Sequence, residues 1–271
     1  MARQLNLGLL ICDTPLPEVI SGHGTYLEIF KTHLQKSLDY ALQESNQPAG
    51  SVDFTLDGYN IVQGAYPDDN KLSTYDGVLI TGSAASAYAP LPWIPPLLEF
   101  IARVAKEFSN IRILGICFGH QVVARAFGGV CVPNEKGWEV GVYNVLLNSL
   151  GVEIFGQKEI RIHQMHRDHV PATSSPPDFE IIGTTPACAN QGMVLRYPNS
   201  NPSDGLKGIH ILTVQGHPEF HESIVSKVID ARELNGVMSP MVVADGRERA
   251  VREHDGTGII GKVMWGVLGV N

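Results

Sequence analysis

The alternation of apolar and polar positions along the chain predicts strands and helices that take turns. Short apolar runs indicate buried strands, whereas apolar residues that recur every three or four positions indicate helices. In the first half of the chain the expected strands are 5–11, 51–56, 75–81 and 111–116, and the expected helices are 26–42, 93–108 and 121–127. Segments 21–25 and 65–70 are expected to be loops, the first capping the helix that follows. This alternation is typical of an α/β fold with a doubly wound, mainly parallel central sheet flanked by helices.

The second half of the chain is richer in strands joined by short turns. Strands are expected at 141–147, 159–164, 179–183 and 189–197, which indicates a mixed or antiparallel extension of the sheet. A further strand is expected at 208–215, and helices at 223–234, 240–253 and 258–267. The Ser- and Pro-rich segments of this half read as loops, because none separates two self-sufficient cores. We therefore expect residues 1–271 to form one domain.

Between the strand 111–116 and the helix behind it lies the pattern Gly115-x-Cys117-x-Gly119. A nucleophile at such a corner sits on a tight, strained turn, where flanking glycines avoid collisions between neighbouring Cβ atoms. We expect Cys117 to point outward, and the helix N-terminus to favour its thiolate. A cysteine can also be simply a small buried hydrophobe, and that is the reading we adopt for the other three cysteines. Cys117 is therefore the candidate nucleophile.

A matching base lies about a hundred residues later. His217 falls just beyond the strand 208–215, at the same end of a parallel sheet as Cys117, so both side chains can face one cleft. Residues two apart in an extended segment point the same way, so Glu219 can reach the His217 ring and fix its tautomer. The three residues together indicate the cysteine, histidine and acid chemistry of acyl transfer.

Two runs of sequence carry a resemblance to a known family. They are Gly115-Ile116-Cys117-Phe118-Gly119-His120-Gln121 and Gln215-Gly216-His217-Pro218-Glu219. Together they resemble the class I glutamine amidotransferase superfamily, which implies a flavodoxin-like fold and hydrolysis of γ-glutamyl amides. The loop Thr81-Gly82-Ser83, Trp93-Ile94 and the Gln-Gly-His-Pro-Glu form of the second run resemble the stand-alone branch that includes γ-glutamyl peptidases and the glutaminase domain of GMP synthase.

The remaining site residues are expected around this centre. In acyl-transfer sites the oxyanion is held by the N–H after the nucleophile, here Phe118, and by one from a strand-to-helix loop, for which Gly82 is the candidate. Gln121 follows the nucleophile by one helical turn, so its amide can reach the pocket. Ser83 and His166 are further candidates for binding substrate. By resemblance to the GMP synthase-like branch, Asp168 is a candidate partner for the α-ammonium of the substrate, although a surface loop is an equally good reading of its segment.

No metal or cofactor is expected. His163, His166, Asp168 and His169 form the densest group of possible ligands, but their spacing on a strand-to-loop segment does not put them on one face. Segment 21–25 lacks the spacing and the lysine of a phosphate-binding loop. The expected chemistry therefore uses side chains, backbone N–H groups and water.

Composition and charge restrict the class of protein and the compartment that we expect. With 44% apolar and 18% charged residues in 271, the chain reads as an ordinary globular protein with a sizeable core. A net charge of −8 without a basic patch argues against nucleic-acid binding. Four cysteines without close pairing indicate a reducing compartment, and no apolar run is long enough for a signal peptide or membrane span. We expect a cytoplasmic protein.

The function expected from these residues is hydrolysis of a γ-glutamyl amide through a thioester on Cys117. A stand-alone γ-glutamyl peptidase that acts on glutathione-like peptides or conjugates is the first reading. A glutaminase subunit that delivers ammonia to a separate synthase partner is the second. A catalytically silent protein that only binds a γ-glutamyl ligand, or an isomerase- or chaperone-like relative with the same cysteine corner, would not need the pair His217 and Glu219.

Overall fold

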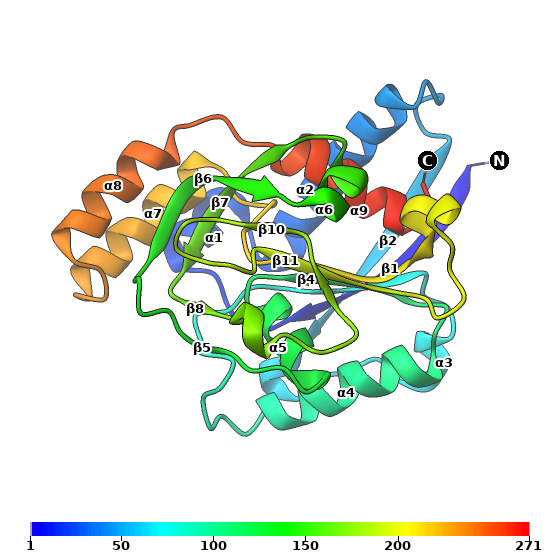
Figure 1. Ribbon diagram of the computed structural model, residues 1–271, viewed down its shortest axis with the longest axis horizontal. Helices are drawn as coiled ribbons and strands as arrows, with labels where there is room; N and C mark the ends of the chain where they lie inside the picture. The colour runs from blue at the N-terminus through cyan, green and yellow to red at the C-terminus, as the bar shows by residue number, and fades with distance from the viewer. Residues whose placement is uncertain (1, 271) are drawn as a thin grey trace.

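A seven-stranded, mostly parallel sheet forms the middle of the molecule (Figure 1). The computed structural model describes residues 2–270. In spatial order the strands are β2 (Val52–Asn60), β1 (Arg3–Ile11), β3 (Gly77–Ile80), β4 (Arg112–Ile116), β12 (Ile209–Val214), β11 (Gly192–Arg196) and β9 (Glu180–Ile181). The pairs from β2 to β12 are parallel, and β11 and β9 continue the sheet in antiparallel fashion. The expected α/β fold class is confirmed.

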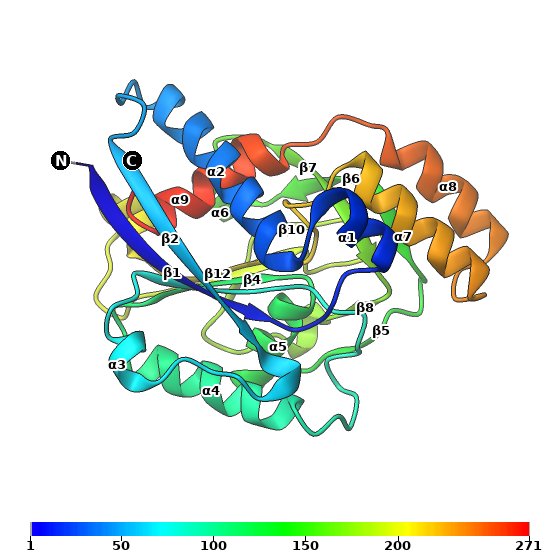
Figure 2. The ribbon, with the colours of Figure 1, turned by 180° about the vertical axis from the view of Figure 1, so that it is seen from behind.

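Helices cover both faces of this sheet, as the two opposite views show (Figures 1 and 2). One layer contains α2 (Tyr26–Glu44) and α9 (Gly261–Val267), and the other contains α3 (Asp69–Leu72), α4 (Ile94–Glu107) and α5 (Phe118–Ala126). Alternate residues of β1 face the two layers, because Leu7 and Leu9 belong to one buried cluster and Leu10 to the other. In the first layer the Trp265 indole N–H donates to the Leu34 carbonyl at 3.1 Å, which ties α9 to α2.

A second, antiparallel sheet stands beside the central one. Its strands are β10 (Gly183–Thr184), β6 (Glu139–Leu147) and β7 (Glu159–His166), and a short pair joins β5 (Val132–Pro133) to β8 (Asp168–His169). The helices near it are α7 (Glu222–Leu234) and α8 (Pro240–Ala250), with α1 (Pro17–His23) packed against α7 (Figure 2). The remaining pieces are α6 (Ser149–Phe155), the 3₁₀ turns Ile61–Gln63, Ala172–Ser174 and Pro202–Gly208, and the π turn Gly256–Ile260.

Several expected elements differ from the structure. Segments 141–147 and 159–164 were expected to extend the central sheet, but they belong to β6 and β7 of the second sheet. These two strands pair with each other along most of their length and not with the central strands. The loop expected at 21–25 is partly helix α1, and Thr25 caps the next helix, its N–H donating to Glu28 at 2.7 Å. Segment 65–70 runs into the short helix α3. Helix α5 begins at Phe118, directly after Cys117, and not at Gln121.

No helix within residues 2–270 combines the length and the apolar character that crossing a lipid bilayer requires.

Candidate active site

The corner between β4 and α5 holds Cys117 in a strained backbone conformation. Its φ of 52° and ψ of −102° are rare for a residue with a side chain, and its N–H donates to the Val214 carbonyl at 2.9 Å. A Cβ on Gly115 would lie 2.8 Å from the Gly119 carbonyl oxygen, and one on Gly119 would lie 2.4 Å from the Ile80 carbonyl oxygen. Both glycines are therefore required by the close approach of α5 to β3 and β4.

Cys117 lines a cavity, but it is far less exposed than an outward-pointing residue at a strand-to-helix corner is expected to be. The residue is 5% exposed and belongs to a buried cluster. Gln215, which follows β12, covers the sulfur and directs its Nε2 to Sγ at 3.6 Å. A Cβ on Gly82 would lie only 3.6 Å from the Cys117 Cβ, so the loop after β3 closes another side. The nucleophile candidate thus sits at the bottom of the site.

His217 and Glu219 form a buried pair beside Cys117. The His217 Nδ1 lies 2.8 Å from Glu219 Oε1, and both side chains are at most 5% exposed. The backbone N–H of His217 donates to the backbone carbonyl of His163 at 2.7 Å. The His217 ring stacks on the Phe220 ring with centroids 4.0 Å apart. Burial alone would lower the pKa of His217, but the charges of Cys117 and Glu219 and hydrogen bonds to both raise it. The ring is therefore fixed in place and favoured in its protonated form.

Two backbone N–H groups belong to residues close to Cys117, namely Phe118, the next residue, and Gly82, where a Cβ would lie 3.6 Å from the Cys117 Cβ. Within residues 2–270 the N–H groups of Gly82 and Phe118 donate to no other protein group. Phe118 N–H is free because it opens helix α5. Gly82 packs on the histidine so closely that a Cβ there would lie 2.7 Å from His217 Cε1.

The other residues singled out by sequence line one cavity with Cys117. This cavity has a volume of about 160 Å³, and its walls include Ser83, Gln121, His166 and Asp168. The Asp168 carboxylate accepts hydrogen bonds from Ser86 Oγ at 2.5 Å and from Tyr88 at 3.3 Å. The Gln121 amide donates to the Asp168 carbonyl at 3.0 Å. The reading of Asp168 as part of a surface loop is therefore wrong, because the segment forms a wall of the cavity and its side chain is 14% exposed.

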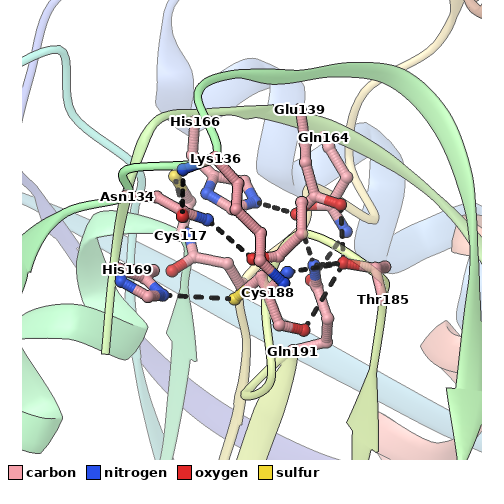
Figure 3. Close-up of polar contacts among 12 residues, drawn as sticks. Cys117, Asn134, Lys136, Glu139, Gln164, His166, His169, Thr185, Cys188 and Gln191 are labelled. Carbon is pink, nitrogen blue, oxygen red and sulfur yellow. Dashed lines mark hydrogen bonds and ion pairs between the residues drawn. The ribbon is translucent and has the colours of Figure 1, made fainter. Parts of the chain in front are cut away.

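A buried polar network, absent from the sequence predictions, holds His166 (Figure 3). Its Nε2 lies 3.2 Å from Glu139 Oε2, and the Glu139 carboxylate also accepts from Thr185 at 2.6 Å and Gln191 at 2.7 Å. The register of β6 and β7 sets Glu139 directly opposite His166. This pairing is long-range, so only a correct strand register would have revealed it from the sequence.

The possible metal ligands noted in the sequence separate in space. His163 packs its ring on His254 with centroids 4.7 Å apart, His166 turns to Glu139, and His169 lies 3.9 Å from the Cys188 sulfur (Figure 3). Within residues 2–270 no three histidine, cysteine or acidic side chains converge as a metal site would require.

Comparison with known proteins identifies the family. Residues 55–231, which include Cys117, Asp168, His217 and Glu219, match the family model described as Glutamine amidotransferase class-I. The chain belongs to this family. As a class I glutamine amidotransferase it is similar to a glutamine amidotransferase-like protein of Schizosaccharomyces pombe, with 36% identity over 224 residues and 83% of each chain covered. It is also 30% identical to gamma-glutamyl peptidase 2 of Arabidopsis thaliana over 235 residues, covering 85% of this chain and 82% of the relative.

Solved structures agree on the fold of this class I glutamine amidotransferase. A glutamine amidotransferase from Thermotoga maritima superposes with a TM-score of 0.65 at 18% identity, covering 97% of this chain and 98% of its own. The family membership makes the chain a hydrolase of the glutamine amidotransferase type, as the sequence resemblance predicted.

Proposed function

We propose that the protein hydrolyses γ-glutamyl amide bonds through a γ-glutamyl thioester on Cys117, as a stand-alone γ-glutamyl peptidase. The observation that carries the proposal is the buried His217, whose Nδ1 is 2.8 Å from Glu219 and whose pKa is raised by the charge of Cys117 and by a hydrogen bond to its side chain. A histidine held in this way keeps Nε2 free for proton transfer at the cysteine. Arabidopsis relatives named gamma-glutamyl peptidases support the substrate class.

In the first half of the reaction the Cys117 thiolate attacks the γ-carbonyl carbon, and a C–S bond forms as the carbonyl π electrons move to oxygen. The N–H groups of Gly82 and Phe118 stabilise this oxyanion. When the intermediate collapses, the C–N bond breaks and the leaving nitrogen takes the proton from His217 Nε2. The products of this half are a free amine and the thioester.

In the second half a water molecule gives one proton to His217 and its oxygen bonds to the thioester carbon. Collapse of that intermediate breaks the C–S bond, restores the thiolate and releases glutamate. Glu219 stabilises the imidazolium that gives up its proton in the first half and is formed again in the second, and it holds the ring in one tautomer. These steps need no group beyond the side chains, the two N–H donors and water.

The cavity of about 160 Å³ beside Cys117 is the proposed glutamyl pocket. Asp168 is anchored by Ser86 and Tyr88, so its charge is held in position to pair with the substrate's α-ammonium group. Gln121 and His166 hold the Asp168 carbonyl, with Gln121 Nε2 at 3.0 Å and His166 Nδ1 at 3.1 Å. Ser83 borders the pocket on the side of the Gly82 loop.

The test is kcat/KM of the isolated protein for γ-glutamyl peptides and for glutamine. We expect turnover of γ-glutamyl peptides without any partner, and its complete loss in Cys117→Ala. If both substrates are inert and glutamine turnover appears only with an added synthase, the protein is an ammonia-delivering subunit and the proposal is overturned. If Cys117→Ala retains activity, the thioester route is overturned.

A further inference from the structure

A second cavity adjoins the proposed glutamyl pocket. It has a volume of about 300 Å³, and His217 forms part of its wall. Its lining shares with the glutamyl pocket the residues Ser83, Ala84, Met165, Arg232 and Val237. An acid that protonates a leaving nitrogen must stand beside it. The pocket with Cys117 and Asp168 therefore suits the glutamyl part of a substrate, and the cavity with His217 suits the amine part.

The walls of this second cavity are mainly apolar. The apolar side chains belong to α1 and the turn before it, to α2, and to the segment 220–228, which includes the start of α7. Figure 2 shows α1 lying beside α7. They include Leu16, Val19, Ile29, Phe220, Ile224 and Val228. Ammonia, the leaving group in glutamine hydrolysis, has no apolar atoms that could contact these walls. A leaving amine with a bulky apolar side chain would fill the cavity.

One cation stands where the two cavities meet. Arg232 of α7 lines both of them, and its guanidinium lies 5.5 Å from the centroid of the Trp138 ring. Within residues 2–270 it has no ion pair, because the acids near it on α7, Asp230 and Glu233, are paired with Arg247 of α8 at 2.7 and 2.6 Å. A guanidinium stacked on an aromatic face and free of carboxylates suits a carboxylate ligand.

Asp13 is the acidic residue in this lining, and its charge is already engaged. Its carboxylate accepts the Thr14 N–H at 2.7 Å and the Ala84 N–H at 2.6 Å, which ties the turn after β1 to the loop after β3. Its engagement with these two N–H groups leaves Arg232 as the charged group available to the amine part of a substrate.

We infer that the preferred substrates are γ-glutamyl peptides whose second residue has a bulky apolar side chain and a free carboxylate, the side chain occupying the His217 cavity and the carboxylate pairing with Arg232. This inference rests on the proposed function. The apolar walls of the second cavity and Arg232 would form a specificity site beside the proposed glutamyl pocket.

The test measures kcat/KM for γ-glutamyl-leucine, γ-glutamyl-glycine, γ-glutamyl-leucinamide and glutamine, with the wild type and Arg232→Gln. The wild type should prefer γ-glutamyl-leucine to γ-glutamyl-glycine by about tenfold or more, the range expected for apolar groups in a fitted pocket. Replacing the free carboxylate with an amide should lower kcat/KM of the wild type by about tenfold or more. It should leave kcat/KM of Arg232→Gln unchanged. Arg232→Gln should lower kcat/KM for γ-glutamyl-leucine at least about tenfold more than kcat/KM for glutamine, because glutamine has no second carboxylate on its leaving group.

A second variant tests the cavity by filling it. Ala231→Phe, on the partly exposed face of α7, should lower kcat/KM for γ-glutamyl-leucine and leave that for γ-glutamyl-glycine within about threefold. Arg252→Gln, an exposed arginine whose partner Glu248 lies one turn away, is the matched control and should change nothing.

Flat selectivity among the peptides, or an equal loss on all four substrates in Arg232→Gln, would overturn the inference while leaving the proposed function intact. An equal loss would mean that Arg232 binds the glutamyl part or supports the fold. If the wild type cleaves none of the γ-glutamyl substrates, the proposed function itself fails and the inference falls with it.

Discussion

The substitution Glu219→Gln removes one charge from the proposed centre with almost no change in shape. The Glu219 side chain is fully buried, and its Oε1 lies 2.8 Å from Nδ1 of a histidine that is 5% exposed. Neutralising the acid of a nucleophile–histidine–acid triad lowers kcat by about 10⁴ in the serine-protease case. We expect kcat/KM of Glu219→Gln to fall by about 10²–10⁴, which corresponds to about 3–5 kcal/mol of transition-state stabilisation. The glutamine amide can also donate to Nδ1, which would leave the proton on the nitrogen that must accept it.

The assay is glutamate release from a γ-glutamyl peptide, with circular dichroism and chemical denaturation to verify the fold. Glu222→Gln is the matched control, because Glu222 is an exposed residue in the first turn of α7 and should change the rate less than twofold. A loss of less than about threefold in a folded Glu219→Gln variant would contradict the proposed role of Glu219. It would mean that His217 works without a charged partner, or that it does not carry the proton.

Three more predictions follow from buried groups. Gly82→Ala should lower kcat at least about tenfold without unfolding the protein, because the added Cβ would meet His217 Cε1 at 2.7 Å; unchanged steady-state kinetics would argue against the close packing of this loop. Iodoacetamide should label Cys117 first, because burial raises the pKa of the other three cysteines, Cys12, Cys131 and Cys188, and peptide mapping that finds uniform labelling would contradict this. Burial also lowers the pKa of His33 to about 4 and of His120 and His163 to about 3, so below the unfolded value of about 6.5 the unfolded state binds protons that the folded state does not. The free energy of unfolding, measured by denaturant titration, should therefore fall by about 1–2 kcal/mol per histidine between pH 7 and pH 5; a flat profile would contradict the burial of these rings.

The part of the site that is local in sequence could be predicted. The spacing Gly115-x-Cys117-x-Gly119 indicated a strained corner, and the structure gives the reason, since a Cβ on either glycine would collide with backbone. The two-residue separation of His217 and Glu219 likewise led to the observed contact at 2.8 Å. The collision at Gly115 with Gly119 and the contact of His217 with Glu219 are local in the chain, whereas the collision at Gly119 is with the distant Ile80.

The part that depends on distant contacts could not be predicted. The cover over Cys117 comes from Gln215 and the Gly82 loop, so no local pattern indicated that the cysteine is buried. Glu139 meets His166 only through the register of the second sheet. Arg232 reads in the sequence as one more charge on an amphipathic helix, and its importance rests on the two cavities that it borders.

The central claim is that Cys117 carries the glutamyl group during turnover. The most direct measurement is the intact mass of the protein after acid quenching of a single turnover with a γ-glutamyl peptide, followed by peptide mapping. We predict a transient adduct of one glutamyl group on the peptide that contains Cys117, and none in Cys117→Ala. Release of glutamate without any adduct on Cys117, or an adduct that persists in Cys117→Ala, would contradict it.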